Sequence, residues 1–146
     1  MLFRSHSLKY KPNLCGNIFK LTDGINIYGY SQHLVYISNY GFADNIGTTP
    51  YTDVGFTLAK ANGYISAFGY SNNCDFMFLP SETLGTNSTP VGDNTIQNNT
   101  DTNWHVLSYG GVWVDSLQCG IFETDVRFSS GIKNKYNGAR LVYIPQ

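Results

Sequence analysis

The chain has 146 residues, a mass of 16.3 kDa and a formal charge of −1, from nine Lys and Arg against ten Asp and Glu. This length is typical of one domain. Clustered Lys and Arg are missing, which excludes a basic nucleic-acid surface, and no apolar run approaches the roughly 20 residues of a membrane helix. With 42% hydrophobic and 15% aromatic residues, the sequence also excludes a disordered chain.

The N-terminal residues 1–12 have no periodicity, and we expect them to be a lead-in that continues a larger N-terminal portion. Residues 13–146 are expected to form the single domain. A short helix is predicted over residues 13–21, because Asn13 is a suitable N-cap and Leu14, Ile18 and Leu21 follow at helical spacing. Asp23 and Gly24 are then expected to turn the chain.

Short strands dominate the rest of the prediction. Tyr and Phe, which favour strands, are frequent, and the 15 Gly suit the turns between them. Turn-rich residues are predicted over 41–50 and a long polar loop over 81–103. Apolar runs or alternating patterns predict strands over residues 25–28, 33–38, 63–68, 75–80, 104–109 and 139–144.

Residues 112–137 are unusually rich in charge, with six of the 19 charged residues in 26 positions. Within this segment, residues 121–128 alternate between two faces. One face carries Phe122 and Val126, and the other carries Glu123, Asp125 and Arg127. The charged face is predicted to meet solvent or a ligand.

Cysteine and histidine give no catalytic or metal-binding pattern. Three cysteines without a CxxC pair predict free thiols rather than a disulfide framework. The segment from Asp93 to Asn99 lacks the acidic spacing and closing Glu of a calcium loop. We therefore expect no enzyme, no metal and no cofactor. The residues concerned are Cys15, Cys74 and Cys119, together with the isolated His6, His33 and His105.

Three short motifs occur in order: Gly16-Asn17-Ile18-Phe19, Gly110-Gly111-Val112-Trp113 and Gly138-Ala139-Arg140-Leu141-Val142. They resemble the skeleton of the formylglycine-generating, or sulfatase-modifying, branch of the C-type lectin fold. The ending Gly-Ala-Arg-Leu-Val-Tyr-Ile-Pro is similar to phage and prophage structural proteins, many of them variable proteins of diversity-generating retroelements. The resemblance implies an α+β class and a C-type lectin-like fold, strand- and loop-rich with one or two short helices.

The same resemblance implies a function. It suggests a receptor-binding domain of a virion tail or fibre, found on the virion or the bacterial cell surface, that binds a bacterial surface protein or glycan. A homo-oligomer within the fibre is expected, without nucleic acid or membrane insertion. The implied contact residues are Val112, Val114, Asp115, Leu117, Glu123, Asp125, Arg127, Ile132, Asn134, Tyr136 and Asn137, and the implied anchors are Gly110, Gly111, Trp113, Gly120, Phe122, Gly138 and Arg140.

Two alternatives stay open at this point. One is a structural virion decoration module that binds no ligand. The other is a degenerate, non-catalytic relative of the sulfatase-modifying enzymes. Those enzymes use a pair of cysteines between the Gly-Gly turn and the last strand, whereas this interval holds only Cys119. A single thiol without a nearby base is a poor nucleophile or copper ligand.

Overall fold

The structure is a computed structural model that describes residues 15–29, 34–97 and 102–138. These residues form ten strands and one 3-10 helix, η1 (Ser116–Gln118), and contain no α-helix. The expected α+β class is therefore wrong for the described chain, which is all-β, and the C-type lectin-like fold is not confirmed. The strands are β1 (Phe19–Tyr28), β2 (Leu34–Ile37), β3 (Thr52–Thr57), β4 (Gly63–Tyr64), β5 (Ala67–Phe68), β6 (Pro80–Glu82), β7 (Asn94–Ile96), β8 (Trp104–Tyr109), β9 (Thr124–Asp125) and β10 (Asn137–Gly138).

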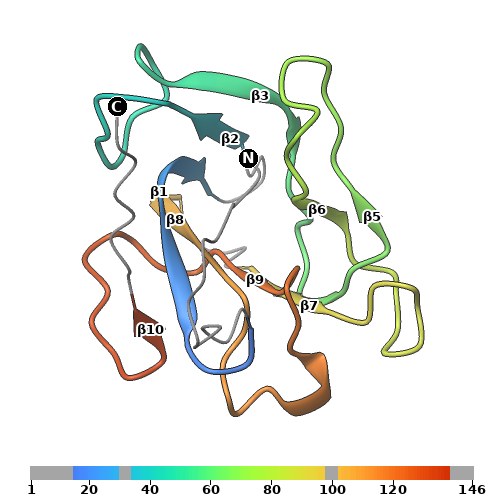
Figure 1. Cartoon of the computed structure of the whole chain (residues 1–146). Coiled ribbons are helices and arrows are strands. Elements are labelled where there is room, and N and C mark those ends of the chain that lie inside the picture. Colours follow the sequence, from blue (N-terminus) through green and yellow to red (C-terminus); the bar gives the residue numbers. More distant parts are fainter. Residues whose placement is uncertain (1–14, 30–33, 98–101, 139–146) are drawn as a thin grey trace, which may run out of the picture.

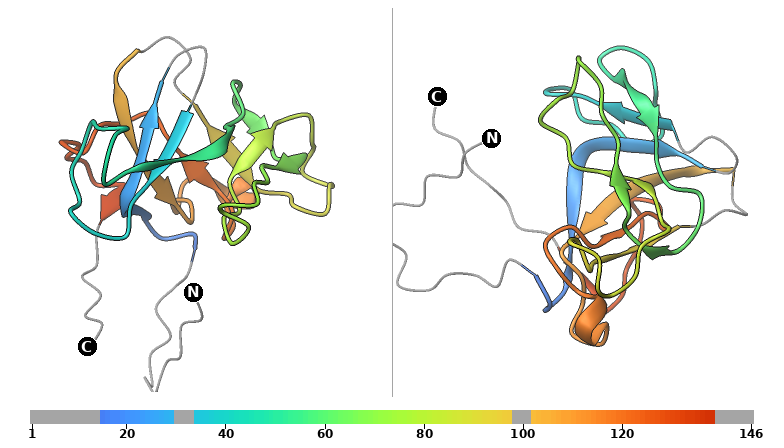
Figure 2. Two further views of the ribbon diagram at one scale, coloured as in Figure 1. Left: turned by 90° about the horizontal axis from the view of Figure 1, so that it is seen from above. Right: turned by 90° about the vertical axis from the view of Figure 1, so that its right-hand side faces the viewer.

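Strand β1 organises a mixed sheet of order β3-β2-β1-β8-β9-β7-β4 (Figure 1). Strand β8 pairs with both halves of β1; on the other edge, the first two residues of β1 pair in parallel with β10 and its second half pairs with β2. The register with β8 shifts between Thr22 and Asn26, around Gly24 at φ 79°. This bulge lets one long strand serve two sets of neighbours. Strands β5 and β6 form a separate hairpin on the side of the molecule away from β10 (Figures 1 and 2).

The hydrophobic core lies between the large sheet and the segment from Leu58 to Leu79. Ile27, Val35 and Val54 are fully buried on β1, β2 and β3, and Leu107 adds the contribution of β8. Cys74, Met77 and Leu79 pack against them from the long connection between β3 and β6. Since these side chains come from distant parts of the sequence, the core fixes the sheet as one unit.

The predicted strands over 25–28 and 104–109 are confirmed as part of β1 and as β8, and β2 confirms the prediction for 33–38 over the described residues 34–37. The turn-rich prediction for 41–50 is also confirmed, since no strand lies between the end of β2 at Ile37 and the start of β3 at Thr52. Residues 63–68 instead split into β4 and β5, which belong to different sheets. The strand predicted over 139–144 and the lead-in over 1–12 lie outside the described residues.

The helix predicted over residues 13–21 is wrong for the described residues 15–21. Gly16 has φ 80°, a left-handed conformation that a right-handed helix does not contain. Phe19 and Lys20 instead pair with β10 on one side, and Lys20 and Leu21 pair with β8 on the other. Sheet pairing on both edges outweighs the helical spacing of the apolar residues.

The buried strand predicted over residues 75–80 is also wrong. Met77 and Leu79 are buried, whereas Phe76 and Phe78 are 57% and 63% exposed. Pro80 begins β6 rather than ending a strand. The long loop predicted over 81–103 contains most of β6 and the whole of β7. Phe78 contacts Phe68 and Phe122. The run is therefore apolar because it contributes to this aromatic cluster, and not because it forms a central strand.

Candidate functional site

The charged segment 112–137 begins and ends beside the start of β1. Val112 forms a parallel bridge with Asn17, whose carbonyl accepts a hydrogen bond from the backbone N–H of Trp113 at 3.1 Å. At the other end, Asn137 pairs with Phe19, and the Phe19 N–H donates to the carbonyl of Tyr136 at 2.8 Å. The two ends therefore meet just before and at the start of β1, and the segment between them encloses a pocket.

This pocket, which we call the β10 pocket, has a volume of about 200 Å³. Phe19 and Val112 are buried within its wall. Its remaining wall comes from Ile96 and from residues of the segment 112–137. The contact residues predicted from the resemblance that line it are Val112, Val114, Asp115, Asp125, Arg127, Asn134, Tyr136 and Asn137. Eight of the eleven are thus brought together.

An ion pair fixes the polar wall of the β10 pocket. Arg127 Nε donates to Asp125 Oδ1 at 3.0 Å, and Arg127 Nη2 donates to Asp125 Oδ2 at 2.7 Å. The Asp125 side chain is 1% exposed and that of Arg127 is 41% exposed. These hydrogen bonds raise the pKa of Arg127, and the Phe128 ring lies 5.0 Å from the guanidinium carbon. The guanidinium is held on two sides in a fixed plane.

An amide network orders the chain in front of β10. Asn134 Oδ1 accepts hydrogen bonds from the backbone N–H groups of Tyr136 and Asn137, at 2.8 and 3.0 Å. It also accepts one from Asn137 Nδ2 at 3.0 Å. Asn137 Oδ1 is buried and has no hydrogen-bond partner among the described residues. The network therefore fixes the Asn137 side chain in the wall of the β10 pocket.

Aromatic side chains form the rim. Tyr136 lines the β10 pocket, and the Trp113 ring lies 6.4 Å from it, centroid to centroid, at an interplanar angle of 42°. Trp113 is 60% exposed and Val114 is 48% exposed. The ammonium of Lys135 lies 5.1 Å from the centre of the Tyr136 ring. An exposed apolar shelf therefore adjoins a polar, preorganised wall.

Several predicted roles need correction. Val112, Glu123 and Asp125 are 4%, 1% and 1% exposed, so they do not face outward. Residues 123–126 are all buried, so other parts of the chain cover both faces of β9. Leu117 and Ile132 lie outside the pocket lining, Leu117 on η1 at 84% exposure. Trp113, expected as a core ring, is on the surface.

The remaining anchors behave differently from one another. Phe122 is half-buried and packs on Phe68 at 5.2 Å between ring centroids. Gly111, at φ 68°, is required by its surroundings, because a Cβ there would collide with Glu123 Oε2 and Cys119 Sγ. A Cβ at Gly120 would collide with the Asp93 carboxylate. Arg140 lies outside the described residues.

Glu123 is a neutral acid inside the protein. Burial first, and then the negative charge of Asp115, raises the pKa of Glu123 to about 9. Burial, followed by the charge of Glu123, likewise raises the pKa of the Cys119 thiol to about 11. Because the thiolate is the reactive form, Cys119 is held in its unreactive state. Both side chains pack against the turn at Gly111.

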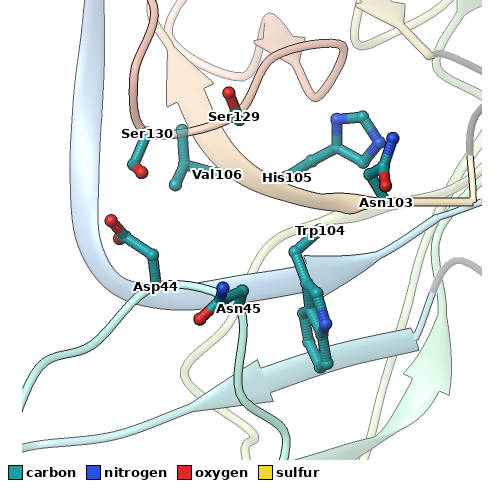
Figure 3. A pocket seen from close by; sticks show the side chains of 8 residues that line it. All are labelled: Asp44, Asn45, Asn103, Trp104, His105, Val106, Ser129 and Ser130. Carbon is teal, nitrogen blue, oxygen red and sulfur yellow. The ribbon is translucent and has the colours of Figure 1, made fainter.

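A second pocket, which we call the β8 pocket, was not predicted from the sequence. It has a volume of about 220 Å³ and lies where β8 begins (Figure 3). Asn26, buried on β1, shapes it by donating from Nδ2 to the carbonyls of Ala43 and Ile46 at 2.8 and 3.0 Å. The sequence signal that could have indicated this pocket was the amide of Asn26 within a predicted strand. The lining residues are Asp44, Asn45, Asn103, Trp104, His105, Val106, Ser129 and Ser130.

The β8 pocket combines a carboxylate, an imidazole and two hydroxyls, the residue types of a hydrolytic triad. Figure 3 shows the His105 ring directed toward Asn103 and away from Asp44. A base must reach both its nucleophile and its orienting acid within hydrogen-bond distance. The arrangement in this pocket does not form that relay.

Comparison with known proteins gives no further assignment: no family model, curated protein or solved structure matches this chain. No group of three or more metal-ligating side chains gathers anywhere in residues 15–29, 34–97 and 102–138. The same residues contain no helix with the length and apolar character to cross a bilayer. The phage and retroelement resemblance thus stays a prediction that depends on the three motifs.

Proposed function

We propose that this chain is a non-enzymatic binding domain that recognises its ligand at the β10 pocket. The observation that carries the proposal is the convergence of eight predicted contact residues on that one pocket. With the sequence resemblance, it leads us to propose a receptor-binding domain of a phage or prophage structural protein, directed at a bacterial surface.

Three features support binding at this place. The Asp125–Arg127 pair and the Asn134 network hold the polar groups before any ligand arrives. Preorganisation of this kind lowers the entropic cost of association. Trp113 and Tyr136 supply rigid aromatic area at the rim, and Trp, Tyr and Arg are the residues most enriched among binding hot spots. A weak single site gains strength when a fibre displays several copies.

The test uses the purified chain, fluorescently labelled, against a panel of whole Gram-negative and Gram-positive bacteria. Tyr136→Ala is expected to reduce binding to a responsive strain at least tenfold. Tyr70→Ala is the matched control, because Tyr70 is 71% exposed and follows β5, on the side away from β10 (Figure 1). If both variants bind like the wild type, the β10 pocket is not the attachment site, and a structural decoration module becomes the better interpretation.

A further inference from the structure

Two carboxylates and one guanidinium line the β10 pocket, those of Asp115, Asp125 and Arg127. Asp125 occupies two donors of Arg127, at 2.7 and 3.0 Å. Asp115 accepts a hydrogen bond from the backbone N–H of Val112 at 3.1 Å, and Lys135 lies against the Tyr136 ring. An anionic ligand would have to compete with Asp125 for the guanidinium, and a cationic ligand would meet that guanidinium directly. The lining therefore opposes an anionic ligand most strongly.

The polar groups are arranged for a ligand that both donates and accepts hydrogen bonds. Asp125 engages the Arg127 guanidinium through Nε and Nη2, and the Asn137 amide lines the same pocket. Asp115 adds a second acceptor to the lining. A hydroxyl group can satisfy either kind of partner. Several hydroxyls on one rigid ring would satisfy donors and acceptors together.

The apolar part of the pocket matches the other half of such a ring. Tyr136 and Trp113 present aromatic surface beside the polar wall. A sugar ring has an apolar C–H face and a polar hydroxyl edge, which correspond to this shelf and this wall. The volume of about 200 Å³ is below the roughly 300–1,000 Å³ of pockets for drug-sized ligands, so it admits one ring rather than a larger group.

We propose that the β10 pocket binds one uncharged saccharide unit of a surface glycan, with Tyr136 and Trp113 against the ring face and Arg127, Asp115 and Asn137 on its hydroxyls. The inference rests on the proposed function and specifies its ligand. A protein partner fits less well, because the centres of protein interfaces are depleted of charged residues, whereas three charged side chains line this pocket.

The test is saturation-transfer NMR of the full chain with methyl α-glucoside, methyl β-galactoside and N-acetylglucosamine. Glucosamine and N-acetylneuraminic acid are the cationic and anionic comparisons. At least one neutral sugar is expected to bind with a dissociation constant of roughly millimolar size, as a single small ring allows. The charged sugars are expected to bind at least tenfold more weakly.

Variants connect the signal to the pocket. Tyr136→Ala and Trp113→Ala are each expected to weaken sugar binding at least fivefold, and Tyr70→Ala is expected to leave it unchanged. Preferential binding of a charged sugar, or no transfer to any neutral sugar, overturns the glycan inference. If whole-cell binding still depends on Tyr136, the proposed binding function stands; its ligand is a charged glycan in the first case and a protein in the second. If cell binding is independent of Tyr136, the proposed function fails as well.

Discussion

Arg127 holds the carboxylate of Asp125 through two parallel side-chain hydrogen bonds, although only one residue separates them in the chain. The backbone N–H of Arg127 donates to the same carboxylate, at 3.0 Å. Three donors thus compensate one buried negative charge. Without this pair, the interior of β9 would contain an uncompensated carboxylate next to the β10 pocket.

We therefore expect Arg127→Ala to lower the free energy of unfolding by about 3 kcal/mol, because removing one partner leaves the other charge buried. The measurement is urea denaturation at pH 7. Lys135→Ala is the control, since that cation lies on the surface of the same segment, and it should change stability by less than about 0.5 kcal/mol. Equal effects of the two substitutions would mean that Asp125 reaches solvent.

Glu123 predicts an unusual pH dependence of stability. Its pKa is about 9 in the folded protein, against an ordinary value of 4.5. Between these values the folded state binds one proton that the unfolded state has lost. The contribution of Glu123 to the free energy of unfolding is therefore fully present below about pH 4.5. As the pH rises toward 9, the free energy of unfolding falls by about 1.4 kcal/mol per pH unit.

The variant Glu123→Gln removes this titration and keeps the size of the side chain. Its advantage over the wild type is expected to grow by about 3 kcal/mol between pH 6 and pH 8. Urea midpoints of both proteins across that range measure the difference directly. A difference that does not change with pH would show that Glu123 is ionised in the folded state.

Gly111 is expected to tolerate no side chain. Its φ of 68° disfavours L-residues, and a Cβ would collide with Glu123 Oε2 and Cys119 Sγ. Gly111→Ala should therefore cost about 2–4 kcal/mol, from backbone strain and overpacking together. At Gly131, the nearest atom to an added Cβ is 3.9 Å away, so Gly131→Ala should be close to neutral. Thermal unfolding of both variants compares the two sites.

The structure places Trp113 on the surface, whereas the sequence predicted that this ring belongs to the core. Iodide should quench Trp113 strongly and Trp104, which is half-buried against Tyr28 and Tyr36, weakly. Trp113→Phe should thus remove most of the quenchable fluorescence. Trp113→Ala should cost less than about 1 kcal/mol in stability, against about 3–5 kcal/mol for a core ring. A loss of stability in the latter range would show that the Trp113 ring is buried.

Sequence patterns predicted the strands whose residues follow one consistent pattern along the whole strand. The run Ile25-Asn26-Ile27-Tyr28 alternates in type, and β8 starts where a polar loop ends. Strand β3 was missed because Asp53 and Gly55 have low strand propensity, although Val54 between them is fully buried. Local strand propensity therefore gives no signal where long-range packing determines the structure.

The predicted contact residues lie together more often than they lie exposed. These residues came from a family resemblance, and the chain does bring most of them together. The error was to treat charged side chains as exposed, which is the usual case. Asp125 has a partner two residues away and Glu123 is neutralised by a proton. Neither compensation is visible from charge pattern alone.

The closure of residues 112–137 onto Asn17 and Phe19 has an evolutionary consequence. Since its two ends are held at Asn17 and Phe19, at the start of β1, insertions around Ser129–Gly131 would lengthen an already closed segment at little entropic cost. The sheet order would be untouched, and the change would fall on the wall of the β8 pocket, which Ser129 and Ser130 line. Homologous chains should therefore differ in length at this place before they differ in β1 or β8.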